Sequence, residues 1–72
     1  MDRQAIESTS IRSIGYEPIN SILEVEFKNG GIYQYFNVPP DVYEELMNTE
    51  SHGIYFHENI KEIYQYAKVD EE

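Results

Sequence analysis

The clearest pattern along the chain is an alternation of apolar and polar residues at positions 23–27, which read Leu-Glu-Val-Glu-Phe. A period of two is typical of a β-strand with one buried face. The pair Asn29-Gly30 follows, and Asn-Gly is preferred in tight hairpin turns. Residues 32–38 then return as a second strand, and a weaker first strand is predicted over residues 11–16.

The register of this hairpin decides which way Tyr33 and Tyr35 point. With a two-residue Asn-Gly loop, Phe27 pairs with Ile32 and both tyrosines lie on the face opposite the core. A three-residue loop shifts the pairing by one and moves both tyrosines into the core, because a one-residue slip exchanges the faces of a strand. The Asn-Gly pair favours the first register, whereas the additional Gly31 suits a bulged turn. We expect the outward-facing register.

Two short helices are predicted after the hairpin. Pro39-Pro40 ends the strand because proline has no N–H to donate, and residues 40–48 carry their apolar side chains on one stripe. A second helix is expected from about Ser51, with apolar positions at helical spacing in Phe56, Ile60, Ile63 and Tyr64. The residues expected to share one core are Leu23, Val25, Phe27, Leu46, Phe56 and Ile60. The predicted fold is α+β: a three-stranded antiparallel sheet, in the order 1-2-3, with two helices packed on one face.

The length of 72 residues allows a single domain. We expect residues 1–9 to form a flexible lead-in, residues 10–66 the domain, and residues 67–72 an acidic tail. A chain this short buries only about 60% of the surface that its unfolded form exposes. Because small cores are often supplemented by association of subunits, we expect a homo-oligomer.

The charge of the chain narrows the choice of partners. Fourteen acidic and five basic residues give a formal net charge of −9. Binding to a phosphate backbone depends on Lys and Arg, so we do not expect double-stranded DNA as a partner. The chain has no cysteine, which suits a reducing cytoplasm. It also lacks an apolar stretch long enough for a membrane helix or a signal peptide, so we expect a cytoplasmic protein without a membrane partner.

Aromatic residues are the candidates for ligand binding, since the chain has seven Tyr and three Phe. Tyr33 and Tyr35, with Tyr16, are candidates for a platform on which bases stack, an interaction worth about 1–3 kcal/mol per base. The alternative is that these rings pack within the core or across strands. The candidate phosphate contacts are Arg12, Lys28, Lys61 and Lys68, and the alternative for them is isolated, solvated charge.

No metal, cofactor or catalytic site is expected. His52 and His57 are five residues apart and point to different sides of a helix, whereas a zinc site needs about four convergent ligands. Catalysis requires a shielded pocket that perturbs pKa values, and so short a chain has little volume for one. We therefore expect a protein that binds rather than an enzyme.

The pattern as a whole resembles a known family. The residues that carry the resemblance are residues 10–16 (Ser-Ile-Arg-Ser-Ile-Gly-Tyr), residues 23–27, Gly30, Tyr33-Gln34-Tyr35, Val38-Pro39, Val42-Tyr43, Leu46, Ser51, Gly53, Tyr55-Phe56, Ile60 and Tyr64. Together they resemble the KTSC domain, which occurs as a lone bacterial or phage protein and at the C-terminus of some lysyl-tRNA synthetases. The resemblance implies a compact α+β fold and, through the synthetases, a role in RNA binding, but no established activity or catalytic residue.

The expected function is non-enzymatic binding of a nucleotide-like ligand or short single-stranded RNA through aromatic stacking. For a free-standing copy, one concrete version is a phage or bacterial protein that sequesters a nucleotide signal in an oligomer. The alternative is a protein–protein interaction module. In that case the acidic surface steers a basic partner, and the exposed sheet edge makes the contact.

Overall fold

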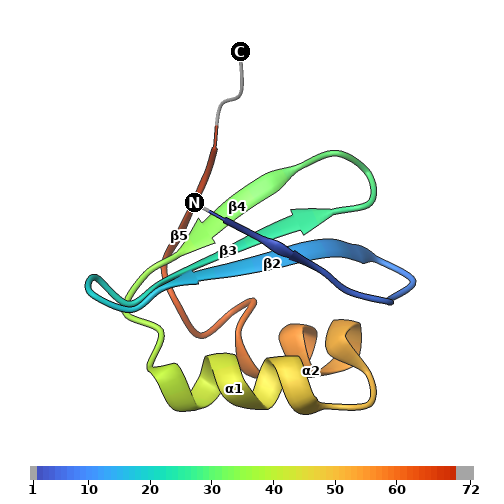
Figure 1. The fold of residues 1–72 in the computed structure, drawn as a ribbon. Coiled ribbons are helices and arrows are strands. Elements are labelled where there is room, and N and C mark those ends of the chain that lie inside the picture. Colours follow the sequence, from blue (N-terminus) through green and yellow to red (C-terminus); the bar gives the residue numbers. More distant parts are fainter. Residues whose placement is uncertain (1, 70–72) are drawn as a thin grey trace.

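A five-stranded antiparallel sheet forms one layer of the molecule and two helices form the other (Figure 1). The computed structural model describes residues 2–69. The strands are neighbours in chain order: β1 (Gln4–Ala5), β2 (Ile11–Glu17), β3 (Ile22–Phe27), β4 (Ile32–Tyr35) and β5 (Tyr66–Lys68). The helices are α1 (Pro40–Asn48) and α2 (His52–Asn59), and both lie against the same face of the sheet. The α+β class with two helices is confirmed, but the prediction of three strands was wrong.

The two additional strands come from the ends of the described chain. β1 lies within residues 1–9, the predicted lead-in, and pairs with β2 so that Gln4 is opposite Ile14. β5 begins at the end of the predicted domain and places Tyr66 opposite Tyr35 of β4. These strands are only two and three residues long, too short to give a pattern of alternation. Residues 70–72 of the predicted acidic tail lie outside the described residues.

The register of the β3–β4 hairpin differs from the expected one. Val25 lies opposite Tyr33, so residues 28–30 form a three-residue loop. Gly30 has a φ of 104°, a left-handed conformation that glycine adopts without steric cost and that typically closes a loop of this length. Because Val25 faces the helices, Tyr33 and Tyr35 face them too, and the prediction of outward-facing tyrosines was wrong.

Two elements end earlier than their apolar patterns predict. β4 ends at Tyr35, and Asn37 has a φ of 60° that turns the chain out of the strand direction; asparagine tolerates this conformation better than most residues. α2 ends at Asn59 rather than continuing to Tyr64, because Ile60 leaves the helical conformation. No helix within the described part of the chain is long and apolar enough to cross a membrane.

The core fills the space between the sheet and the helices. Its buried members are Ile11, Ile14, Leu23, Val25, Tyr35, Val38, Leu46, Phe56 and Ile60. Five of the six predicted core residues belong to this cluster, and Phe27, the sixth, is partly buried and packs against it. The predicted core is therefore confirmed.

The opposite face of the sheet carries a buried carboxylate. Glu24 is only 5% exposed; its carboxylate accepts hydrogen bonds from the Arg3 guanidinium and, at 2.8 Å, from Gln34 Nε2. Arg3 reaches Glu24 because the chain before β1 passes directly over Gly15, where a Cβ would collide with the Asp2 carbonyl oxygen. The N-terminal segment is thus held across the sheet by an ion pair and by a position that only glycine fits.

We expect Val25→Asp to unfold the domain, because Val25 is fully buried and the new carboxylate would be buried without a partner. Circular dichroism during heating should show no cooperative transition. Ile19→Asp makes a similar change at a side chain that is 88% exposed and should melt like the parent, since surface substitutions rarely exceed about 0.5 kcal/mol. A cooperative, parent-like melt of Val25→Asp would contradict the assigned core.

We expect Arg3→Ala to lower the free energy of unfolding by about 1–3 kcal/mol, because it leaves the Glu24 carboxylate buried without its cation. The same substitution should cost less in a Glu24→Gln background, where the buried charge is gone and only the longer pair of Arg3 with Glu26, at 3.7 Å, remains. Urea denaturation of the two single variants and the double variant measures this coupling. Equal costs of Arg3→Ala in both backgrounds would show that the ion pair does not hold the N-terminal segment.

Candidate functional site

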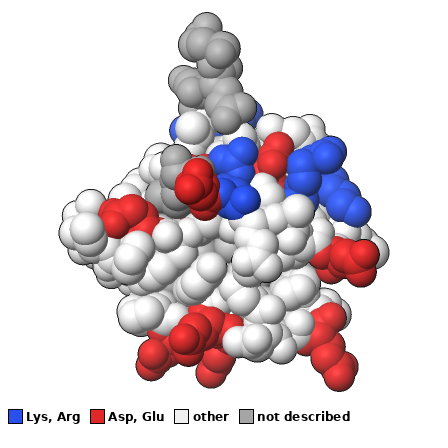
Figure 2. All heavy atoms as spheres, viewed as in Figure 1, with Lys and Arg blue, Asp and Glu red and all other residues white. Residues whose placement is uncertain are grey.

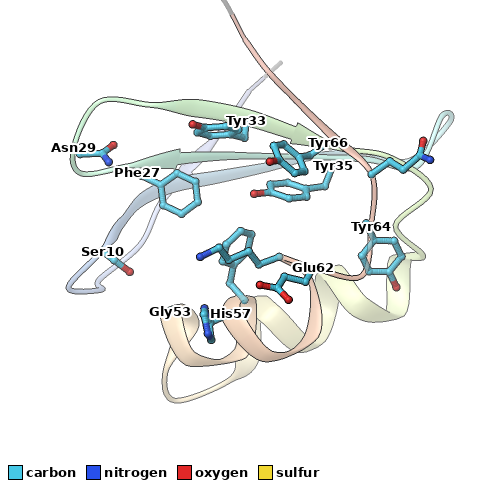
Figure 3. A pocket seen from close by; sticks show the side chains of 13 residues that line it. Ser10, Phe27, Asn29, Tyr33, Tyr35, Gly53, His57, Glu62, Tyr64 and Tyr66 are labelled. Atoms are coloured by element: carbon cyan, nitrogen blue, oxygen red, sulfur yellow. The ribbon is translucent and has the colours of Figure 1, made fainter.

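An open cleft of about 870 Å³ lies between the sheet and the α2 side of the helical layer (Figure 3). It opens here because α2 ends at Asn59, and a series of turns over residues 60–65, not a helix, leads back to β5. Its aromatic lining consists of Phe27, Tyr33, Tyr35, Phe56, Tyr64 and Tyr66. The cleft is therefore built from one helix, one turn segment and the β3, β4 and β5 side of the sheet.

Five of these rings contact one another in a closed circuit. In order around the circuit they are Phe27, Tyr33, Tyr66, Tyr35 and Phe56, and successive ring centroids are 5.3–5.8 Å apart. We call these five residues the aromatic circuit. Three of its contacts are edge-to-face and two are tilted, and such contacts between rings add about 0.5–1.5 kcal/mol each beyond the burial of area. The wall of the cleft is consequently held in shape before any ligand arrives.

The aromatic circuit extends from the core to the surface. Tyr35 is 4% exposed and Phe56 is 5% exposed, whereas Tyr66 is 58% exposed and Tyr33 is half-buried. Figure 3 shows the rings of Tyr33, Tyr35 and Tyr66 together on the sheet side of the cleft. The surface that a ligand can reach is therefore provided by Tyr66 and Tyr33, while Tyr35 and Phe56 support them from behind.

Exposed polar side chains line the opposite side of the cleft. His57 comes from α2, and Lys61 and Glu62 come from the turns that follow it. His57 and Glu62 lie across the cleft from the tyrosines in Figure 3. Gln65 and the hairpin residue Asn29 also line the cleft, Asn29 from the sheet side. The cleft thus has an apolar, aromatic side and a polar side that carries charges of both signs.

Of the residues predicted to bind a ligand, Tyr33, Tyr35 and Lys61 line this cleft. Tyr16 stacks on Tyr43 with centroids 4.8 Å apart, and its hydroxyl donates a hydrogen bond of 2.6 Å to the Val38 carbonyl. Through these two contacts, Tyr16 packs α1 and the segment between β4 and α1 against the sheet. The structure does not bring Tyr16 together with the other two tyrosines.

Two of the predicted phosphate contacts, Arg12 and Lys28, lie outside the cleft. Arg12 is exposed at an irregularity in β2, and its Nε lies 3.9 Å from Glu26 Oε2. Lys28 is exposed in the hairpin loop, where its N–H donates a hydrogen bond of 2.8 Å to the Ser10 carbonyl. Neither side chain lines the cleft, so neither is in position to contact a ligand bound there.

Sequence reasoning missed Tyr66, although a signal for it was present, and it gave no location for Lys61, one of the candidate phosphate contacts. The triplet Tyr33-Gln34-Tyr35 of β4 recurs as Tyr64-Gln65-Tyr66 at the start of β5. The two triplets meet in the same cleft, and β4 and β5 pair through Tyr35 and Tyr66. Lys61 has no comparable signal, because its position depends on where α2 ends.

The two histidines have separate surroundings. The ring Nδ1–H of His52 donates a hydrogen bond of 2.7 Å to the Leu46 carbonyl, which ties the start of α2 to the last turn of α1. His57 lies on the rim of the cleft. Within residues 2–69, no three His, Asp or Glu side chains converge in a way that could hold a metal ion.

Burial in the aromatic circuit raises the pKa of Tyr35 from 10.0 to about 12, and the neighbouring Tyr66 and Tyr33 contribute to the rise. A raised pKa means that folding favours the neutral phenol. Tyr35 should therefore stabilise the fold fully below pH 10, and this stabilisation should be lost as pH rises towards about 12. Urea denaturation across this range should show a steeper loss for the parent than for Tyr35→Phe.

Tyr55 also has a pKa raised to about 12, first by desolvation and then by its hydrogen bond to Glu45. The comparison with Tyr35→Phe separates the two tyrosines because this variant retains Tyr55. Parallel curves for the parent and Tyr35→Phe would contradict the burial of Tyr35 in the aromatic circuit.

The chain is similar in sequence and in structure to several known proteins. The family model of the KTSC domain matches residues 7–64. A protein from Stutzerimonas stutzeri is 44% identical over 71 residues, which are 97% of this chain and 100% of that protein. The crystal structure of a KTSC domain protein from Yersinia pestis superposes with a TM-score of 0.94 at 38% identity, covering 96% of this chain and 97% of that one. A lysine–tRNA ligase from Nostoc sp. is 44% identical over 63 residues, 88% of this chain but only 11% of the ligase.

Proposed function

The chain belongs to the KTSC domain family, and from this premise we propose that it is a non-enzymatic binding module whose cleft holds a nucleotide-like ligand or short single-stranded RNA. The observation that supports the proposal is the aromatic circuit beside a polar rim in one open cleft. Bases stack on aromatic side chains whatever their sequence, because every base has a π-face. In a free-standing chain, retention of a small nucleotide in an oligomer is the most concrete form of this function.

The exposure of the rings assigns them different parts in the proposed binding. A base can stack only on ring surface that solvent reaches, which Tyr66 and Tyr33 provide. Tyr35 belongs to the core, so its removal would damage the fold together with the site. The similarity to a segment of a lysine–tRNA ligase agrees with a nucleic-acid ligand, since the name of that protein includes a tRNA.

We expect Tyr66→Ala and Tyr33→Ala each to weaken the binding of nucleotides or short single-stranded RNA by about 1–3 kcal/mol, the typical loss when a stacked ring is removed. Isothermal titration calorimetry measures the affinity, and circular dichroism confirms that each variant remains folded. Ile19→Ala is the control, because it removes an exposed apolar side chain remote from the cleft lining. Affinity that is unchanged in both tyrosine variants, or no binding of any nucleotide or RNA by the parent, would overturn the proposal.

A second candidate function is supported by the edge of the sheet. All three residues of β5 are exposed, and β5 pairs on one side only, with β4. An open edge can accept a strand from another chain, including a second copy of this one, as expected for a homo-oligomer. Exposed acidic residues of the helical layer (Asp41, Glu44, Glu45, Glu50 and Glu58) would steer a basic partner. Such a module predicts partner binding that weakens steeply with salt and no binding of nucleotides.

A further inference from the structure

The size of the cleft and its two chemically different sides bear on which ligand it takes, if the proposed function holds. A volume of about 870 Å³ falls within the range of roughly 300–1,000 Å³ that is usual for small-molecule sites. The accessible rings of Tyr66 and Tyr33 lie on one side, and His57 and Glu62 lie on the other. Lys61, which precedes Glu62 in the chain, also lines the cleft. A ligand with a planar end and an anionic end matches this division.

Lys61 is the only Lys or Arg among the residues that line the cleft. Its side chain is exposed, and the ion pairs within residues 2–69 involve Arg3 and Arg12 instead. The ammonium group therefore remains open to an anion. One cation suits one phosphate group, whereas the neighbouring Glu62 would repel a second.

The other cations belong to the sheet layer and not to the helices. Arg12 is in β2 and Lys68 is in β5, while Arg3 precedes β1 and Lys28 is in the β3–β4 loop. In the view of Figure 2, Lys and Arg side chains lie in the upper part, over the sheet, with Asp and Glu side chains beside them, whereas the charged side chains along the lower edge, over the helices, are all Asp or Glu. A nucleic-acid strand needs a positively charged groove that follows its backbone. In this cleft, the single cation Lys61 is instead followed directly by the acidic residue Glu62.

From the single cation, the volume and the aromatic side, we infer that the cleft binds one nucleotide unit, with its base on Tyr66 and Tyr33 and its phosphate at Lys61. The specific ligand class is thus a mononucleotide, and not an extended RNA strand. This inference rests on the proposed function and adds to it the position of the phosphate.

The test compares three probes by isothermal titration calorimetry: adenosine, adenosine monophosphate and a short oligoadenylate. We expect the monophosphate to bind about ten- to a hundredfold more tightly than the nucleoside, as a charge-assisted hydrogen bond provides. Lys61→Gln should remove this difference and leave adenosine binding unchanged, while Glu62→Gln should strengthen the binding of the monophosphate. Lys28→Gln is the matched control, because Lys28 is also an exposed lysine but lies outside the cleft lining.

The possible outcomes separate this inference from the proposed function. Oligoadenylate that binds at least about tenfold more tightly than the monophosphate, with a steep dependence on salt, would show a strand site and overturn the inference alone. Equal losses for nucleoside and monophosphate in Lys61→Gln would also overturn it, since the lysine would then not contact the phosphate. Failure of all three probes, with uridine and its monophosphate as further probes, would overturn both the inference and the proposed function.

Discussion

The hydrogen bond of 2.8 Å from the Phe27 N–H to the Gly31 carbonyl closes the β3–β4 loop after three residues, and the side of the sheet on which Tyr33 and Tyr35 lie depends on it. A loop shorter by one residue would turn both tyrosines to the outer face, because successive side chains of a strand point to opposite faces. The left-handed conformation of Gly30 allows the longer loop. Tyr33 and Tyr35 take part in four of the five contacts of the aromatic circuit, so the cleft is a consequence of this turn.

The outer face of the sheet, which points away from the helices, is covered by the N-terminal segment. In place of a second helical layer, the N-terminal segment crosses β2 at Gly15 and brings Arg3 to the buried carboxylate of Glu24. Burying an ion pair is costly unless its remaining hydrogen-bonding capacity is satisfied. Gln34 donates to the same carboxylate, and Ser13 accepts a hydrogen bond from Arg3 Nε at 3.0 Å. These partners fix the position of β1, which covers the free edge of β2.

The parts of the fold that could be predicted from the sequence are those in which many residues repeat one pattern. The alternation at 23–27 and the stripe at 40–48 correctly gave β3, α1 and most of the core. The remainder depends on single contacts. One left-handed glycine decides whether the hairpin loop consists of Asn29-Gly30 or of Lys28-Asn29-Gly30. The apolar spacing continues past Asn59, although the helix does not. For the site, the pattern indicated two aromatic residues, but Lys61 and Tyr66 become neighbours of Tyr33 only through the turns that follow α2.

A domain of this size has to build its cleft from residues of its own core. Binding is therefore coupled to the order of β5, the edge strand that carries Tyr66. Phe56 and Tyr35 are core residues and also members of the aromatic circuit, which continues to Tyr66 in the three-residue strand β5. So short a strand has few backbone hydrogen bonds, and the contacts of Tyr66 with Tyr33 and Tyr35 help to hold it against β4. A base stacked on Tyr66 would add to these contacts, and ligands that bind only the folded state stabilise it. A strand added to the free edge of β5 by a second chain would stabilise the same element, so each of the two candidate functions depends on the order of β5.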